Sequence, residues 1–255
     1  SSIAISSEFS PNPPLPPVEA LFPREYRGVK LHTKSIAYLT RQMTAELKYQ
    51  WDIQGTRKPR ISLRTRVHII RSSTPAEITS RLVARARKER ITLNSILNAA
   101  LIISIQKLKY GGAQIPYRYM SFADLRPYLE PPPPANQFAS YVSMLRFTIK
   151  PLPRENLWSL ANRVNQQIYR ATKMGEKFIT AYMSEQFMRL TFGLKKIRMC
   201  ATAISYTGST GLLPPKNHPI QIKSIQGFVS NIGLGPEFSG VVSFQNNTLC
   251  WNMLY

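Results

Sequence analysis

The side chains best suited to acid–base or metal chemistry are few in this sequence and stand far apart. Its three histidines are His32, His68 and His218, and none has a second histidine or an acid at the spacing of a metal site or a catalytic base. Asp and Glu number only 13 in 255 residues, which disfavours a site built from paired carboxylates. No Walker, GxGxxG or GxSxG motif occurs. We therefore interpret the histidines as surface or structural residues, and the sequence on its own gives no catalytic group.

The two cysteines, Cys200 and Cys250, are too few for a zinc site and too far apart for a disulfide scaffold. Free cysteine usually behaves as a small apolar side chain. We therefore expect both in the core, with a single bridge between them as the alternative. No metal and no tightly bound cofactor are expected.

Composition and charge describe a folded, strongly basic chain. With 43% hydrophobic residues it should bury a sizeable core, and 34 Lys and Arg against 13 Asp and Glu give a net charge of +21. Such a charge attracts phosphates, acidic proteins and anionic membranes. The longest apolar run, from Ile96 to Ile105, is about half the length that crosses a bilayer.

The N-terminus lacks the basic-then-apolar order of a secretion signal and passes quickly into proline-rich sequence. We expect a cytoplasmic protein, with peripheral attachment to a membrane as the alternative. Residues 1–30 are interpreted as a Pro-rich connector, because closely spaced prolines hold the chain extended. The chain would then start at a processed end or inside a longer polypeptide.

Helical and strand periodicities predict the elements of the first half. A helix over residues 33–47 should pack one apolar face on the core: Ile36, Leu39, Met43 and Leu47. Residues 57–71 alternate as a strand with a basic outward face.

The next helix has a clear start signal, with Thr74 as N-cap, Pro75 at the first helical position and Glu77 reaching back to the cap. On its wheel, one side should face the core: Ile78, Leu82 and Ala86. The other side carries the basic residues Arg81, Arg85 and Lys88. A second helix, capped by Thr92, is apolar on nearly all sides and should be buried.

The second half predicts further strands and one clear amphipathic helix. Apolar residues follow the helical series from Leu157 to Ile168, and this pattern stops before Gly175; residues 176–199 are predicted to be helical too. Strands are predicted at four places: 115–125, 141–149, 200–208 and 219–228. A last hairpin should turn at Asn246 and Asn247. Alternating helices and strands predict an α/β fold in which helices pack on a layered mixed sheet.

Short motifs stand in a definite order along these segments. Thr92 and Asn94 form a T-x-N at the start of the buried helix, and Asp124 and Arg126 form a D-L-R after a strand. This order resembles the C-terminal lobe of the condensation-like acyltransferases. They belong to the chloramphenicol acetyltransferase-like superfamily, with peptide-synthetase condensation domains, alcohol acetyltransferases and polyketide-associated acyltransferases. The resemblance covers nearly the whole chain, with residues 31–255 as the lobe.

Two further motifs match in part. Ser205 and Gly208 match the S-N-x-G strand of these acyltransferases, with Tyr206 where asparagine is usual. Ala139 and Ser140 replace the glycine and asparagine of a common L-G-N-Y-V-S. By resemblance, Ser205 and Gly208 would contact the coenzyme A or phosphopantetheine arm of a thioester substrate. Arg126 would hold the active-site region in place, or simply pair with Asp124.

The resemblance also implies something that the sequence lacks. Members have two lobes with a tunnel between them, and the second histidine of an HHxxxD motif in the N-terminal lobe is the general base. This chain has no HH pair. We therefore interpret it as the C-terminal half of an acyltransferase, whose partners are a complementary N-terminal lobe and an acyl carrier protein or coenzyme A. It would be a cleaved or separately supplied lobe, or a remnant with a new role.

The arginines leave alternatives open. Residues 57–90 hold eleven lysines and arginines against two acids. They could attract an acidic carrier protein, coenzyme A or an anionic membrane, track nucleic-acid phosphates, or form a solvated face. Aromatic residues are not interleaved with them, so nucleic acid ranks second. The alternative function is a non-catalytic basic binding or assembly module on the same scaffold.

Overall fold

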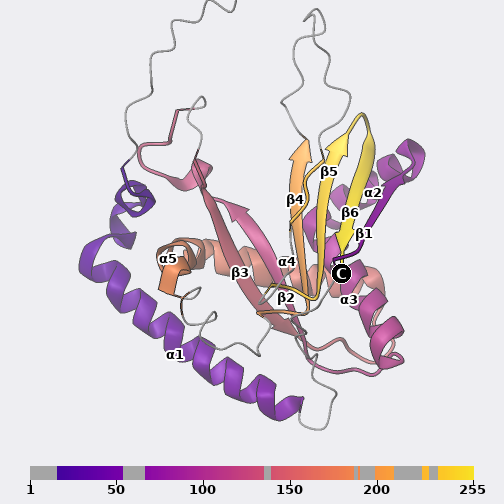
Figure 1. Ribbon diagram of the computed structural model, residues 1–255, viewed down its shortest axis with the longest axis horizontal. Helices are drawn as coiled ribbons and strands as arrows, with labels where there is room; N and C mark the ends of the chain where they lie inside the picture. Colours follow the sequence, from indigo (N-terminus) through magenta and orange to yellow (C-terminus); the bar gives the residue numbers. More distant parts are fainter. Residues whose placement is uncertain are drawn as a thin grey trace, which may run out of the picture.

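The structure is a computed structural model that describes residues 16–53, 67–134, 139–186, 189, 199–209, 226–229 and 235–255. In chain order, its elements are η1 (Val18–Leu21), η2 (Arg24–Tyr26), α1 (Gly28–Asp52), β1 (Ile69–Thr74), α2 (Ala76–Glu89), α3 (Leu93–Tyr110), β2 (Tyr117–Asp124), η3 (Arg126–Tyr128), β3 (Val142–Ile149), α4 (Leu157–Lys173), α5 (Glu176–Tyr182), β4 (Thr202–Ser209), β5 (Phe238–Gln245) and β6 (Thr248–Leu254). The strands form one sheet in the order β1-β6-β5-β4-β2-β3 (Figure 1). β4 runs parallel to β2 and β5, and the other neighbours are antiparallel. The predicted α/β fold with a mixed sheet is confirmed.

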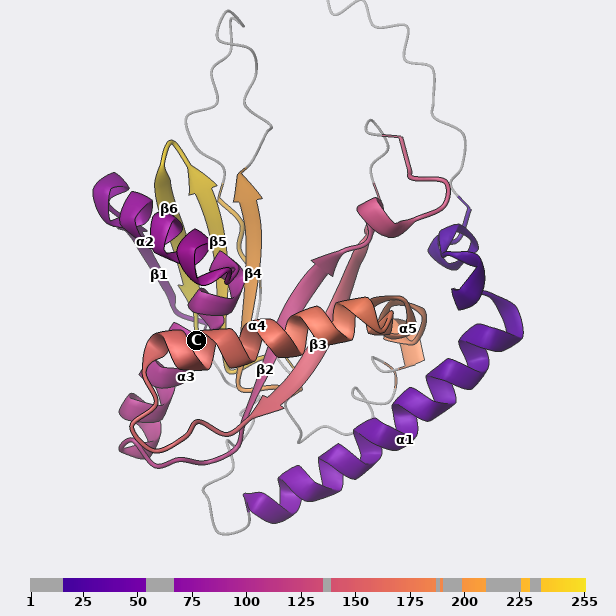
Figure 2. The ribbon, with the colours of Figure 1, turned by 180° about the vertical axis from the view of Figure 1, so that it is seen from behind.

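Helices α2, α3 and α4 cover one face of the sheet (Figure 2). The main core cluster lies between this layer and the strands, where Ile102 of α3 and Val164 of α4 pack near Tyr119 of β2. All three side chains are fully buried. The helix predicted from Leu157 onward is confirmed as α4, and it ends before Gly175 as expected. The alternating pattern of the sequence thus produces the layered core.

The N-cap predicted for α3 is also confirmed. The hydroxyl of Thr92 accepts a hydrogen bond from the backbone N–H of Ser95 at 3.3 Å. Asn165 of α4 reaches the same turn, and its Oδ1 accepts from the Thr92 N–H at 3.2 Å and from the Ser95 hydroxyl at 3.1 Å. The cap therefore also joins α3 to α4.

Thr92→Ala is expected to lower the free energy of unfolding by about 1 kcal/mol, because it removes the acceptor of an N-cap. Urea unfolding followed by circular dichroism measures the change. Thr92→Ser keeps the oxygen and should retain most of the stability. Equal losses in the two variants would show that the hydroxyl is not the stabilising group.

The start of α2 differs from the prediction by one position. Pro75 occupies the N-cap, where no side chain makes a capping hydrogen bond, and Thr74 is the last residue of β1. Pairing with Leu249 of β6 keeps Thr74 extended, and its hydroxyl accepts from Nε1 of Trp251 at 2.9 Å. The sheet therefore takes the hydroxyl that the sequence pattern had assigned to the helix.

The faces of α2 follow the prediction only in part. Ala86 is buried and Leu82 is half-buried against the core, but Ile78 is 47% exposed and Thr79 takes its place inside. Glu77 pairs with Arg81 at 3.7 Å and makes no bond to the cap. The basic residues Arg81, Arg85 and Lys88 do face outward, as expected.

Helix α1 is longer than predicted, and the face that it packs against the fold is opposite to the predicted one. It packs against α5 and η2 through Leu31, Ser35 and Tyr38. Of the four residues expected to face the core, only Leu39 packs there. The other three are exposed, because a second apolar row on the opposite side is the one that contacts the fold. We call the exposed row the outer stripe of α1; its members are 65–78% exposed: Val29, Ile36, Met43, Leu47 and Trp51.

Part of the predicted connector belongs to a second core cluster. Phe22 is completely buried, and Tyr26 packs 4.8 Å from the ring of Phe178 in α5. Leu125, next to the D-L-R arginine, belongs to the same cluster. The boundary at residue 30 stays a prediction, but η1 and η2 are anchored to the lobe.

Three predicted strands and the predicted hairpin turn are present among the described residues. The strands at 115–125, 141–149 and 200–208 correspond to β2, β3 and β4, and Asn246 and Asn247 turn with φ of 48° and 61°. Cys200 is buried, Cys250 is half-buried, and these two described thiols are not bridged. The helix predicted at 176–199 begins as α5, and most of its remainder lies outside the described residues, as do His218 and most of the strands predicted at 57–71 and 219–228. Among the described residues, no single helix is long and apolar enough to cross a membrane. Helices α2 and α3 together would be long and apolar enough, but they are bent by 106° relative to each other.

Candidate functional site

The start of α3 fixes Asn94 against the sheet. Its Nδ2 donates a hydrogen bond to the hydroxyl of Ser121 on β2 at 2.7 Å, and Ser121 is fully buried. Asn98, one turn further on, donates to the backbone oxygen of Asn94 at 2.9 Å and to its Oδ1 at 3.1 Å. The T-x-N motif therefore joins the start of the buried helix to β2 at Ser121.

The D-L-R motif forms a compact turn at the end of β2. Oδ1 of Asp124 accepts from the backbone N–H of Arg126 at 3.0 Å, and the two side chains form an ion pair at 3.4 Å. Both side chains are about half exposed, and the guanidinium lies 5.5 Å from the ring centre of Tyr141. This geometry agrees with the structural alternative, a local ion pair. A role near the active site stays a prediction.

Ser205 and Gly208 lie on β4, next to β2. Ser205 is half-buried and pairs with Val241, and a register shift separates Tyr206 from Gly208. Gly208 has φ of +68°, a conformation in which an L side chain is strained. Burial raises the pKa of Tyr206, which stands where asparagine is usual. The glycine of the motif is thus required by the backbone at the bulge.

The Asn94 and Ser205 motifs meet where β2 pairs with β4. Ser121 pairs in register with Ile204, so the Asn94 contact lies beside the start of the Ser205 motif. Beyond this pair the two parallel strands diverge towards their carboxyl ends, so Asp124 and Gly208 stand at the ends of separated strands (Figure 1). Ligands of α/β sheets commonly bind beyond the carboxyl ends of the strands. The basic residues Arg81, Arg85 and Lys88 lie elsewhere, on the outer side of α2.

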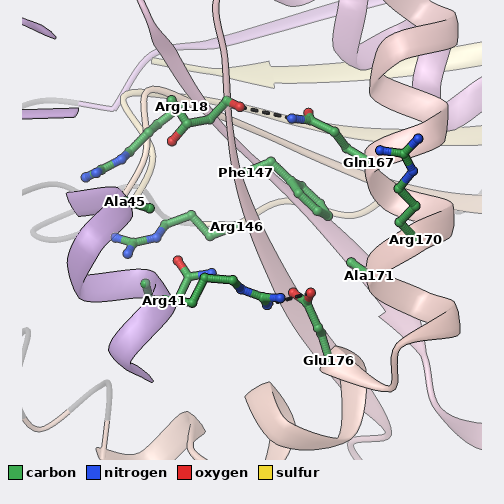
Figure 3. Close-up of a pocket in the computed structure, with 11 residues that line it drawn as sticks. Arg41, Ala45, Arg118, Arg146, Phe147, Gln167, Arg170, Ala171 and Glu176 are labelled. Carbon is green, nitrogen blue, oxygen red and sulfur yellow. Dashed lines mark hydrogen bonds and ion pairs between the residues drawn. The ribbon is translucent and has the colours of Figure 1, made fainter. Parts of the chain in front are cut away.

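A second feature was missed by sequence reasoning. A pocket of about 300 Å³, the arginine pocket, lies between α1, β2, β3, α4 and α5 (Figure 3). Five charged residues line it: Arg41, Arg118, Arg146, Arg170 and Glu176. The available signal was an arginine inside each of two otherwise apolar strands, in YRYMSF and MLRFTI. Buried arginine requires a partner, so an arginine inside an apolar strand indicates a buried ion pair or hydrogen bond.

Ion pairs organise the arginine pocket. Arg118 and Arg146 share one carboxylate oxygen of Glu46, at 2.8 Å and 3.7 Å, and Arg41 pairs with Glu176 at 2.6 Å. Burial, and secondly the neighbouring charge of Arg118, lower the pKa of Arg146. No group of three His, Cys, Asp or Glu that could hold a metal occurs among the described residues.

Comparison with known proteins gives a family and a fold. Residues 63–214 match the family described as phthiocerol/phthiodiolone dimycocerosyl transferase C-terminus. No curated protein sequence matches the chain.

Three solved structures share the fold at low sequence identity. Polyketide synthase associated protein 5 of Mycobacterium tuberculosis is 15% identical, with a TM-score of 0.54 over 78% of this chain and 50% of that one. The trichothecene 15-O-acetyltransferase of Fusarium sporotrichioides is 14% identical, with a TM-score of 0.69 over 94% of this chain and 51% of that one. The EpoB cyclization-docking bidomain of Sorangium cellulosum is 13% identical, with a TM-score of 0.56 over 90% of this chain and 44% of that one.

The chain therefore spans about half the length of the solved structures that it matches. Its sheet and helices share the fold of a part of the trichothecene 15-O-acetyltransferase and of the first condensation domain of the CDA synthetase. The family match covers more than half of the chain, from the segment before β1 to the segment after β4. This chain belongs to the family of phthiocerol/phthiodiolone dimycocerosyl transferase C-termini.

Proposed function

We propose that this chain is the C-terminal half of an acyltransferase. The enzyme would move an acyl group from a coenzyme A or carrier-protein thioester to a hydroxyl or amine, with the HHxxxD base supplied by a complementary N-terminal lobe. The observation that carries the proposal is the family match of a chain that spans half of its structural relatives and has no HH pair. The paired part of β2 and β4, with Asn94 and Ser205, and the Asp124–Arg126 turn at the end of β2 form the candidate wall of the substrate tunnel.

The proposed step balances without any further reactant. The histidine of the other lobe takes a proton from the acceptor hydroxyl or amine, which attacks the thioester carbonyl. The tetrahedral intermediate then expels the thiolate, and the thiolate takes up the proton from the histidine. This chain would position the substrates: the Asp124–Arg126 turn and the Asn94–Ser121 bond hold this wall in place.

The outer stripe of α1 is the surface on which we propose that the complementary lobe docks. Its residues lie on one side of a 25-residue helix, at spacings of seven and then four residues. Exposed apolar rows of this length are unusual on a monomer and mark contact surfaces. About half of each structural relative has no counterpart in this chain.

Intact-mass spectrometry of material purified under native conditions is the first experiment. We expect a second polypeptide of similar size that carries HHxxxD, and the pair should transfer acyl groups from acyl-CoA or acyl carrier protein, measured as released thiol. Neither chain should do so alone. A homogeneous chain with no second polypeptide, or a pair that releases no thiol with any donor, would favour the non-catalytic binding or assembly role.

Substitutions separate docking from folding. Leu47→Asp should abolish copurification with the other lobe and leave the melting temperature of this chain unchanged, because Leu47 is 72% exposed. Leu108→Asp is the matched control, since Leu108 is 84% exposed at the end of α3, outside the stripe. If both variants fail to copurify with the other lobe, or if both still copurify with it, docking on α1 is contradicted.

A further inference from the structure

We propose that the arginine pocket is a binding site for a diphosphate or phosphate ester. The inference does not depend on acyl transfer. Charge is its first support. The four arginines of the pocket meet two carboxylates, Glu176 in the wall and Glu46 behind it. Arg170 has no acidic partner among the described residues. Two positive charges are therefore in excess, and a dianion would balance them.

The arrangement of the buried arginines is the second support. The Arg118 side chain is only 5% exposed, and its guanidinium lies 3.7 Å from the ring centre of Tyr49. Arg146 lies close enough to share a carboxylate oxygen with it. Two guanidinium groups that share one carboxylate repel each other in a weakly solvated place. A further anion beside them would relieve this repulsion.

The shape of the pocket indicates the class of anion. Figure 3 shows Arg146 extending from β3 towards α1, while Gln167 and Arg170 stand on α4 at the opposite wall and Phe147 lies between them. A volume of about 300 Å³ lies at the lower end of the range for small-ligand sites. The guanidinium fork matches phosphate oxygens in pairs, and amide and hydroxyl groups complete such sites. Gln42 and Thr148 supply those groups here, while the Gln167 amide accepts from the Tyr119 hydroxyl at 2.8 Å and donates to the Thr148 carbonyl at 3.0 Å.

Titration calorimetry with inorganic pyrophosphate, at fixed ionic strength, tests the proposal on the full 255-residue chain. We expect saturable binding of one equivalent. Arg146→Gln should weaken this binding by about tenfold, because a charge-assisted contact is lost. The variant should stay folded, since Arg118 keeps Glu46. Arg170→Gln, at an exposed position, should weaken binding with no effect on folding.

Arg81→Gln is the matched control, because it removes the same charge from the outer side of α2. Equal weakening by Arg81→Gln and Arg146→Gln would mean attraction to the net charge alone and would overturn the proposal, as would an absence of saturable binding. Competition by coenzyme A would identify its diphosphate as the natural source. If pyrophosphate binds and coenzyme A does not compete, the pocket serves a separate small phosphate ligand.

Discussion

Gly175→Ala is expected to lower the free energy of unfolding by about 3 kcal/mol, through a left-handed backbone and a steric overlap. Gly175 has φ of +73°, and a Cβ built there would lie 1.9 Å from the hydroxyl oxygen of Tyr26. Tyr26 has little room to move. Its hydroxyl donates to the Met174 carbonyl at 3.1 Å, its ring packs on Phe178, and Lys34 lies 3.9 Å above it.

The measurement is thermal unfolding, in which such a loss corresponds to a melting temperature lower by about 6–12 °C for a chain of this size. Gly111→Ala is the matched control, because Gly111 also has a positive φ, of +58°, but no atom lies within 4 Å of its Cβ position. We expect it to cost only about 1 kcal/mol. Similar losses in the two variants would show that the Tyr26 contact does not restrict residue 175.

The fold could be predicted from the sequence wherever one face of an element is apolar and the other polar. The helix from Leu157 has one such face, and its position and end were predicted correctly. Helix α1 has two apolar rows, and periodicity cannot tell which one contacts the fold. Three of the four predicted residues face away from the fold, since Ile36, Met43 and Leu47 belong to the outer stripe. Similarly, a hydroxyl beside a helix start suits a cap, but the partner of Thr74 lies 177 residues away in β6.

The candidate site shows the same limit. The motifs at Asn94, Asp124 and Ser205 are local, so the sequence indicates them, although only the pairing of β2 with β4 brings Asn94 and Ser205 together. The arginine pocket has no local motif. Arg118 and Arg146 come from antiparallel strands, and their shared acid, Glu46, comes from a helix placed by packing. Such a cluster depends on tertiary structure, and a lone arginine in a strand gives only a hint of it.

Glu46→Gln is expected to destabilise the chain by about 3 kcal/mol, because it leaves the buried Arg118 without a countercharge. Burial alone would raise the pKa of Glu46. Hydrogen bonds from Gln50 and Arg118, with the charges of Arg118 and Arg146, outweigh burial and hold it below the ordinary value of 4.5. Glu77→Gln is the matched control, since its pair with Arg81 is exposed and spans 3.7 Å, and it should change stability by less than about 0.5 kcal/mol.

The depressed pKa also gives the destabilisation a definite pH dependence. A carboxyl whose pKa is lower in the folded chain than in the unfolded chain stabilises the fold fully above the unfolded value, and this contribution is lost as the pH falls through the folded value. The difference in melting temperature between the wild-type chain and Glu46→Gln should therefore be largest above about pH 5 and shrink towards pH 3. A constant difference across this range would mean that the substitution acts through packing. If pyrophosphate then raises the melting temperature of Glu46→Gln more than that of the wild-type chain, an anion in the arginine pocket is replacing the lost carboxylate charge.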